Sequence, residues 1–151
     1  MLEIIKTKKR WEDIFLKIKD KSVLCSYTYV KAASNLEADG EAVLGVYWIK
    51  EKFIIHPFIK RKIKNTEYFD IISVYDFGGF WFNCDLRKQK EDLILGFEKA
   101  FISFCKDNFV ISEFIRLNPF FDHSLLDNTD YTVDHFKDNI VLNLKNKPFE
   151  M

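Results

Sequence analysis

The spacing of apolar residues along the chain predicts a mixed α/β (α+β) fold. Short runs rich in aromatic and β-branched residues indicate strands, whereas apolar residues at i, i+3, i+4 and i+7 indicate amphipathic helices. The predicted strands span residues 2–5, 41–49, 52–63, 68–74 and 109–117, and a final hairpin joins 131–135 to 139–144. The predicted helices cover residues 11–18, residues 27–37 and the apolar stripe from Leu93 to Phe104. We expect these elements to form a mixed, mostly antiparallel sheet flanked by helices.

Residues 41–49 and 52–63 form a predicted hairpin that turns at Lys50 and Glu51. Both alternating faces of its first strand are apolar, so we expect helices to cover both sides of that strand. Pro57 lies inside the second strand and has no backbone N–H to donate. A proline in this position favours an edge strand or a bulge.

The stretch 68–82, YFDIISVYDFGGFWF, is the centre of the predicted organisation. Its first half suits a strand buried in a sheet, and Asp76 with Gly78 and Gly79 then ends that strand. Glycine lacks a Cβ, so the backbone there can take a positive φ or let another molecule come close. A loop between a strand and a helix is where α/β folds usually bind a ligand, although an ordinary turn fits the same spacing.

One acidic residue interrupts the apolar pattern of the predicted strand 109–117. Alternation places Phe114 and Arg116 on one face and Glu113 on the other, among isoleucine side chains. A carboxylate on an apolar face needs a partner or a shifted pKa. Glu113 is therefore a candidate functional group, and a structural contact that braces the neighbouring loop is the alternative.

The composition narrows the classes of function. A chain of 151 residues suits one domain, and 23 basic residues balance 23 acidic ones. The chain thus lacks the strong positive field of a dedicated DNA-binding protein. The basic run at 60–64 is most simply a solvated strand end, with a phosphate-contacting patch as the alternative.

Cysteine and histidine positions predict no metal site. The three cysteines have no CxxC spacing, so we expect reduced thiols in the cytoplasm rather than disulfides or bound zinc. The three histidines lie far apart in sequence and are expected to be structural or surface residues. No stretch approaches the roughly 18 apolar residues of a membrane span, and the basic cluster that follows the first apolar residues leads us to expect no signal peptide in this segment.

Two segments carry a resemblance to a known family. SVYDFGG at 73–79 and, after a predicted helix, SEFIRLNPFF at 112–121 resemble the first half of the Fem-type aminoacyltransferases and the related FemAB- and BioF2-like acyltransferases. Upstream, SYTYVKAAS at 26–34 and HPFIKRKI at 56–63 match the same half in order and spacing. Because those proteins contain two GNAT-like domains, the resemblance implies that residues 1–151 form a single GNAT-like domain equivalent to the first.

The resemblance also implies a reaction, the transfer of an acyl or aminoacyl group to an amine of a cell-envelope or surface-glycan precursor, as in polysaccharide biosynthesis. Acyl-CoA or aminoacyl-tRNA would be the donor, and a small molecule, nucleotide-sugar or peptide would be the acceptor. Glu113 would be the catalytic base, and the substrate-binding residues would be Tyr75, Asp76, Gly78, Gly79, Arg116 and Asn118.

The chain departs from the family pattern at three positions near this site. Val74 stands in place of the loop proline, Asp76 in place of the first glycine, and Asn118 in place of the histidine before Pro119. The glycine-rich CoA-binding loop of GNAT enzymes is also missing. We therefore expect a half-unit that needs a second GNAT-like domain from another chain or from a homodimer. A noncatalytic acceptor-binding remnant and a protein-interaction module are the alternatives.

Overall fold

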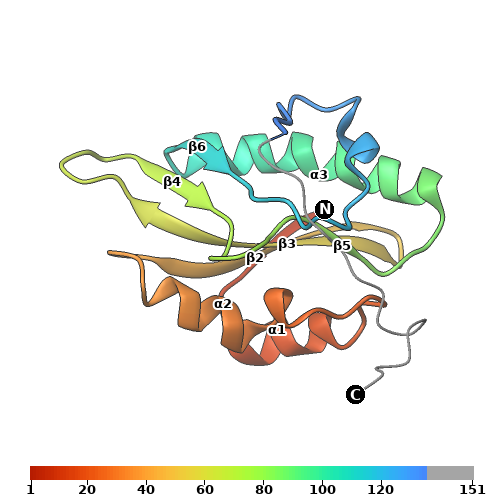
Figure 1. Ribbon diagram of the computed structural model, residues 1–151, viewed down its shortest axis with the longest axis horizontal. Coiled ribbons are helices and arrows are strands. Elements are labelled where there is room, and N and C mark those ends of the chain that lie inside the picture. The colour runs from red at the N-terminus through yellow and green to blue at the C-terminus, as the bar shows by residue number, and fades with distance from the viewer. Residues whose placement is uncertain (136–151) are drawn as a thin grey trace, which may run out of the picture.

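The computed structural model describes residues 1–135, which form a six-stranded sheet with helices on both faces (Figure 1). The strands are β1 (Leu2–Ile5), β2 (Glu41–Ile49), β3 (Lys52–Lys62), β4 (Phe69–Ile72), β5 (Trp81–Phe82) and β6 (Val110–Phe114). The helices are α1 (Lys8–Phe15), α2 (Tyr27–Ser34) and α3 (Arg87–Asp107), with short 3-10 turns at Val23–Cys25 and His123–Leu126. No helix in this part of the chain is long and apolar enough to cross a membrane.

The strand order is β1-β2-β3-β4-β6, and β5 pairs with the other end of β3. All neighbouring strands are antiparallel except β4 and β6, which run parallel because α3 carries the chain back across the sheet between them. The mixed, mostly antiparallel sheet predicted from the sequence is confirmed.

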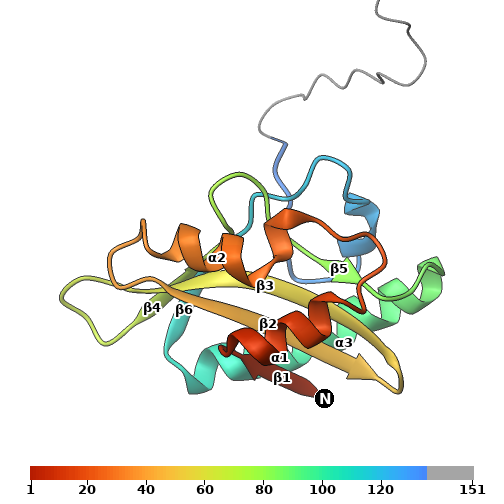
Figure 2. The same ribbon diagram turned by 90° about the horizontal axis from the view of Figure 1, so that it is seen from below.

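Apolar side chains fill two layers, one on each side of the sheet. Trp11 of α1 and Phe53 of β3 lie in the layer beneath α1 and α2, and Phe58 of β3 and Phe97 of α3 lie in the layer beneath α3. Figure 2 shows α1 and α2 crossing the face of the sheet opposite α3. Helices therefore cover both faces of β2, as its apolar pattern predicts.

Pro57 occupies a gap in the pairing of β3. On one side it lies opposite Leu44 of β2, so β3 is not an edge strand. On the other side β5 pairs with β3 only up to Ile55, and β4 pairs with it only from Ile59 onward. The missing N–H of the proline falls between these two partners, where no ladder bond is required.

Residues 131–135 are not a strand, so the first half of the predicted final hairpin is wrong, and residues 139–144 lie outside the described part of the chain. Side chains hold this segment instead. The Tyr131 hydroxyl donates to Glu113 at 3.1 Å, and the backbone N–H of Asp130 donates to Glu98 of α3 at 2.6 Å. Apolar alternation alone does not distinguish a segment anchored in this way from a strand.

Candidate functional site

The chain segments that follow β4 and β6 stay together beyond the ends of these strands. The N–H of Ser73 donates to the Phe114 carbonyl oxygen at 3.0 Å, and the N–H of Gly78 donates to the Arg116 carbonyl oxygen at 2.8 Å. The N–H of Asn118 donates back to the Gly78 carbonyl oxygen at 3.2 Å. The two segments at 73–79 and 112–121 are therefore direct neighbours.

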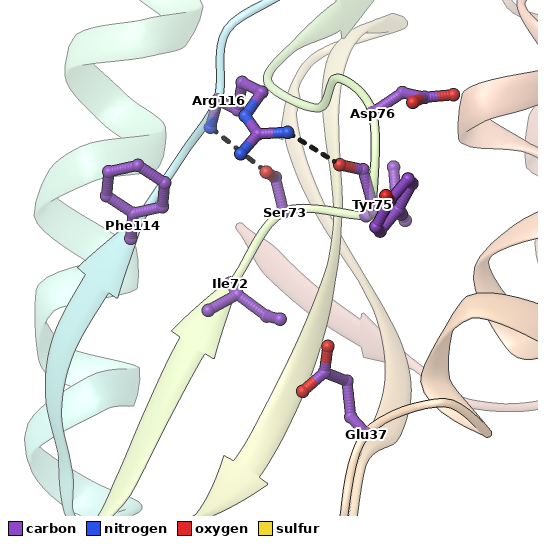
Figure 3. A pocket seen from close by; sticks show the side chains of 8 residues that line it. Glu37, Ile72, Ser73, Tyr75, Asp76, Phe114 and Arg116 are labelled. Atoms are coloured by element: carbon purple, nitrogen blue, oxygen red, sulfur yellow. Dashed lines mark hydrogen bonds between the residues drawn. The ribbon is translucent and has the colours of Figure 1, made fainter.

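A pocket of about 410 Å³ opens where these segments leave the sheet. Polar and aromatic side chains surround it beside a few aliphatic ones (Figure 3). Its lining residues are Glu37, Ile72, Ser73, Val74, Tyr75, Asp76, Phe114 and Arg116. Its size falls within the range of roughly 300–1,000 Å³ that is usual for small-molecule sites.

Arg116 is held at this pocket by two hydrogen bonds (Figure 3). Its backbone N–H donates to the Ser73 hydroxyl oxygen, and its Nη1 donates to the Tyr75 carbonyl oxygen, each at 3.0 Å. Both contacts come from the segment after β4, so the guanidinium is oriented by the same loop that forms the pocket wall. Of the predicted substrate-binding residues, Tyr75, Asp76 and Arg116 line the pocket.

The other three predicted binding residues hold the loop together from within. Gly78 and Gly79 are buried, and the N–H of Gly78 is already donated to Arg116, so this N–H is not available to a ligand. Gly79 has a φ of +115°, a conformation that favours glycine. Asn118 closes a turn, because its side-chain oxygen accepts from the N–H of Phe120 at 2.9 Å.

Replacing Gly78 by alanine is expected to destabilise the protein by about 1–3 kcal/mol, because a Cβ there would lie 2.5 Å from the Cβ of Ser73. Urea unfolding followed by circular dichroism measures the change. Asp76→Ala in the same loop is the matched control, since Asp76 is exposed and should change the free energy of unfolding by less than about 0.5 kcal/mol. Equal stability of the two variants would contradict the packing argument.

Glu113 does not line the pocket and points into the opposite layer of the sheet. Its Oε1 lies 2.7 Å from Nε2 of His56, and its Oε2 accepts from the Tyr131 hydroxyl. His56 is fully buried, and its ring is surrounded by four phenylalanine rings at centroid distances of 5.0–5.8 Å. The expectation that Glu113 needs a partner on its apolar face is therefore met by a buried polar cluster of His56, Glu113 and Tyr131.

Hydrogen-bond geometry shows where this cluster must carry protons. Nδ1 of His56 lies 2.9 Å from the Gly79 carbonyl oxygen, which can only accept, so Nδ1 carries a proton. The short contact between Nε2 and the Glu113 carboxyl then requires one more proton, on the imidazole or on the carboxyl. The cluster thus ties Glu113, through His56, to the carbonyl of Gly79 in the loop that follows β4.

Burial and the negative charge of Glu113 raise the pKa of two neighbouring groups. Burial is the larger cause for Tyr131, and the carboxylate adds to it, so the pKa of this hydroxyl rises well above its ordinary value. The same two causes raise the pKa of the Cys105 thiol to about 12. Both groups therefore stay protonated beside Glu113, and Tyr131 can act as a hydrogen-bond donor to it at any physiological pH.

Sequence reasoning missed two residues of this region, since neither Tyr131 nor Glu37 was singled out. His56, expected to be a structural or surface residue, is a buried structural one, but its partners were not predicted. The apolar run IIHPF around His56 contained a usable signal, since a histidine in a buried strand needs polar partners just as Glu113 does. The contacts of Glu37 and Tyr131 come from segments distant in sequence and have no local signal.

The comparisons with known proteins do not identify a family. No protein-family model, curated protein or solved structure matches this chain.

Proposed function

We propose that this chain is the acceptor-binding half-unit of a Fem-like N-acyltransferase, built as a GNAT-like domain, and that it acts with a second such domain from another chain or from a second copy. One observation carries the proposal. The two segments that bear the family resemblance, 73–79 and 112–121, are bonded side by side and together supply most of the pocket lining. A mixed, mostly antiparallel sheet between helices is also the architecture that the resemblance implies.

In the proposed reaction an amine nitrogen attacks the carbonyl carbon of the acyl donor, the amine gives up a proton, and the bond to the leaving group breaks. Arg116 would hold a carboxylate or phosphate of the acceptor, because a guanidinium binds both through paired N–H groups. Glu113 cannot take a proton directly from a molecule in the pocket, since it faces the other layer. Asp76 and Glu37 are the carboxylates that line the pocket.

The position of Glu113 favours one alternative, a noncatalytic protein that binds the acceptor without acting on it. Its two carboxylate oxygens are engaged by His56 and Tyr131, as in a structural cluster.

A second alternative, a protein-interaction module, is supported by β6. Within residues 1–135 this strand is paired only with β4, and it carries the exposed side chains of Ile111 and Phe114.

An NMR titration of the ¹⁵N-labelled full chain separates these functions. We expect a nucleotide-sugar with a free amino group, UDP-glucosamine, or a short amine-bearing peptide to shift the amide signals of residues 73–77 and of Arg116, whereas acetyl-CoA alone should not bind. Arg116→Gln should weaken acceptor binding about tenfold or more, which is the loss of one charge-assisted interaction. Arg10→Gln is the control, since Arg10 pairs with Glu3 on β1.

Sedimentation and an acyl-transfer assay complete the test. The proposal requires that transfer occur only with a second domain, supplied by a dimer or a partner chain. Acceptor binding without transfer in any assembly would favour the noncatalytic alternative. If neither acceptor probe binds and the chain stays monomeric, the half-enzyme proposal fails.

A further inference from the structure

The pocket carries opposite charges on two of its sides. Arg116 supplies the positive side, and within residues 1–135 its guanidinium has a backbone carbonyl as hydrogen-bond partner but no carboxylate within ion-pairing distance. A guanidinium that is oriented by its own loop and not neutralised by an acid is suited to bind an anionic group. Figure 3 shows Arg116 and Glu37 at different ends of the pocket.

The side of the pocket next to α2 has an excess of negative charge. Arg61 donates both to Glu37 at 2.8 Å and to Asp70 at 2.6 Å, so its single charge is divided between two carboxylates. Asp76 accepts from the neutral Tyr29 hydroxyl of α2 at 3.3 Å and gains no compensating cation there. Of the carboxylates named here, only Glu37 and Asp76 line the pocket, and Glu37 shares its guanidinium partner with Asp70. The pKa of the Tyr29 hydroxyl is raised, first by burial and then by the Asp76 charge, so this group stays a neutral donor to Asp76.

The rim of the pocket is aromatic and open. The side chain of Tyr75 is 77% exposed and that of Phe114 is 64% exposed, and both line the pocket. An exposed aromatic pair on a rim provides apolar contact area for the carbon skeleton of a ligand without hindering its entry.

We infer that the pocket binds a small zwitterionic molecule, with its carboxylate or phosphate on Arg116 and its protonated amine on the side of Asp76 and Glu37. This inference rests on the proposed function, because it names the chemical class of the acceptor that the half-unit binds. A ligand with both charges is attracted by both sides of the pocket. A molecule with only the anionic group is repelled by the carboxylates of Asp76 and Glu37, and a molecule with only the amine is repelled by Arg116.

Four probes of similar size test the inference by isothermal titration calorimetry or NMR at low ionic strength: 5-aminovalerate, 2-aminoethyl phosphate, valerate and pentylamine. The first two carry both charges, with a carboxylate and a phosphate respectively, and the last two carry one charge each. We expect at least one zwitterion to bind about tenfold more tightly than valerate and pentylamine, the difference made by one additional ion pair. The zwitterion that binds more tightly shows whether the pocket prefers a carboxylate or a phosphate. Equal affinity of pentylamine and 5-aminovalerate, with 2-aminoethyl phosphate no tighter, would overturn the inference.

Two variants test which side of the pocket binds the anionic group and which side binds the amine. Arg116→Gln should reduce the affinity for the preferred zwitterion to that for pentylamine, and Asp76→Asn should reduce the affinity for 5-aminovalerate toward that for valerate. Arg10→Gln, which changes a distant ion pair, should leave all four affinities unchanged. An Arg116→Gln variant that binds the zwitterion as well as the wild type would overturn the inference. Zwitterion binding without acyl transfer would leave the inference standing and sink the proposed enzyme, whereas transfer to a nonzwitterionic acceptor would do the reverse.

Discussion

Replacing His56 by alanine is expected to lower the free energy of unfolding by about 3–5 kcal/mol, the range found when a large buried ring is truncated to alanine. The substitution leaves the Gly79 carbonyl and the Glu113 carboxyl without their partner, and it opens a cavity among the phenylalanine rings around the imidazole. For a chain of this size the midpoint of thermal unfolding should fall by roughly 10 °C.

His123→Ala is the matched control for this experiment. His123 is exposed and lies at the surface turn His123–Leu126, so its removal should change stability by less than about 0.5 kcal/mol. Denaturant unfolding followed by circular dichroism measures both variants. A loss at His56 as small as that at His123 would show that the imidazole is not anchored as the geometry indicates.

A double-mutant cycle separates the polar contact from the cavity. Glu113→Ala alone leaves the imidazole without its acidic partner, whereas the double variant with His56→Ala removes both members of this contact. We expect the double variant to be more stable than the sum of the single changes predicts, by about 1–3 kcal/mol. Strict additivity would mean that the 2.7 Å contact contributes nothing to the folded state.

The fold could be predicted to the extent that it depends on local apolar patterns. The hairpin of β2 and β3, the two covered faces of β2 and the long helix α3 all follow from spacing that a few neighbouring residues carry. The missing strand at 131–135 shows the limit of this reasoning. Its segment is held by Glu113 and Glu98, and these contacts join residues that lie 18 and 32 positions apart.

The site could be predicted only in part, because it depends on which side chains from distant segments come into contact. Alternation correctly separated Glu113 from Arg116, and the need of Glu113 for a partner followed from its apolar neighbours. The identity of that partner did not follow, since His56 reaches Glu113 from β3 through the interior. The role of Gly78 was likewise hidden. Its amide is used by Arg116 of the neighbouring segment, a contact that only the parallel pairing of the two segments creates.

The protein is expected to lose stability as the pH rises above about 8.5, because folding prevents two thiols, those of buried Cys25 and half-buried Cys105, from ionising. Burial raises the pKa of Cys25 to about 11, and burial together with the Glu113 charge raises the pKa of Cys105 to about 12. Below about pH 8.5 these thiols hold their protons in both the folded and the unfolded state, and their contribution to stability is fully present. Above it the unfolded chain releases protons that the folded chain keeps. The free energy of unfolding then falls with pH until the pH reaches the folded pKa.

Cys25 contributes a slope of at most about 1.4 kcal/mol per pH unit, and half-buried Cys105 contributes less because solvent screens it, so a Cys25→Ala, Cys105→Ala double variant should show a pH slope that is shallower by about 1.5–2.5 kcal/mol per unit between pH 9.5 and 10.5. Denaturant unfolding at a series of pH values measures this slope, which is independent of the constant loss from the two small cavities. Cys84→Ala is the comparison, because burial raises the pKa of Cys84 while nearby Lys90 and Lys52 oppose the rise, so its effect on the slope should be smaller. If the double variant and the wild type lose stability in parallel, the two thiols ionise as readily in the folded chain as in the unfolded one, and their burial does not control the alkaline limit of the fold.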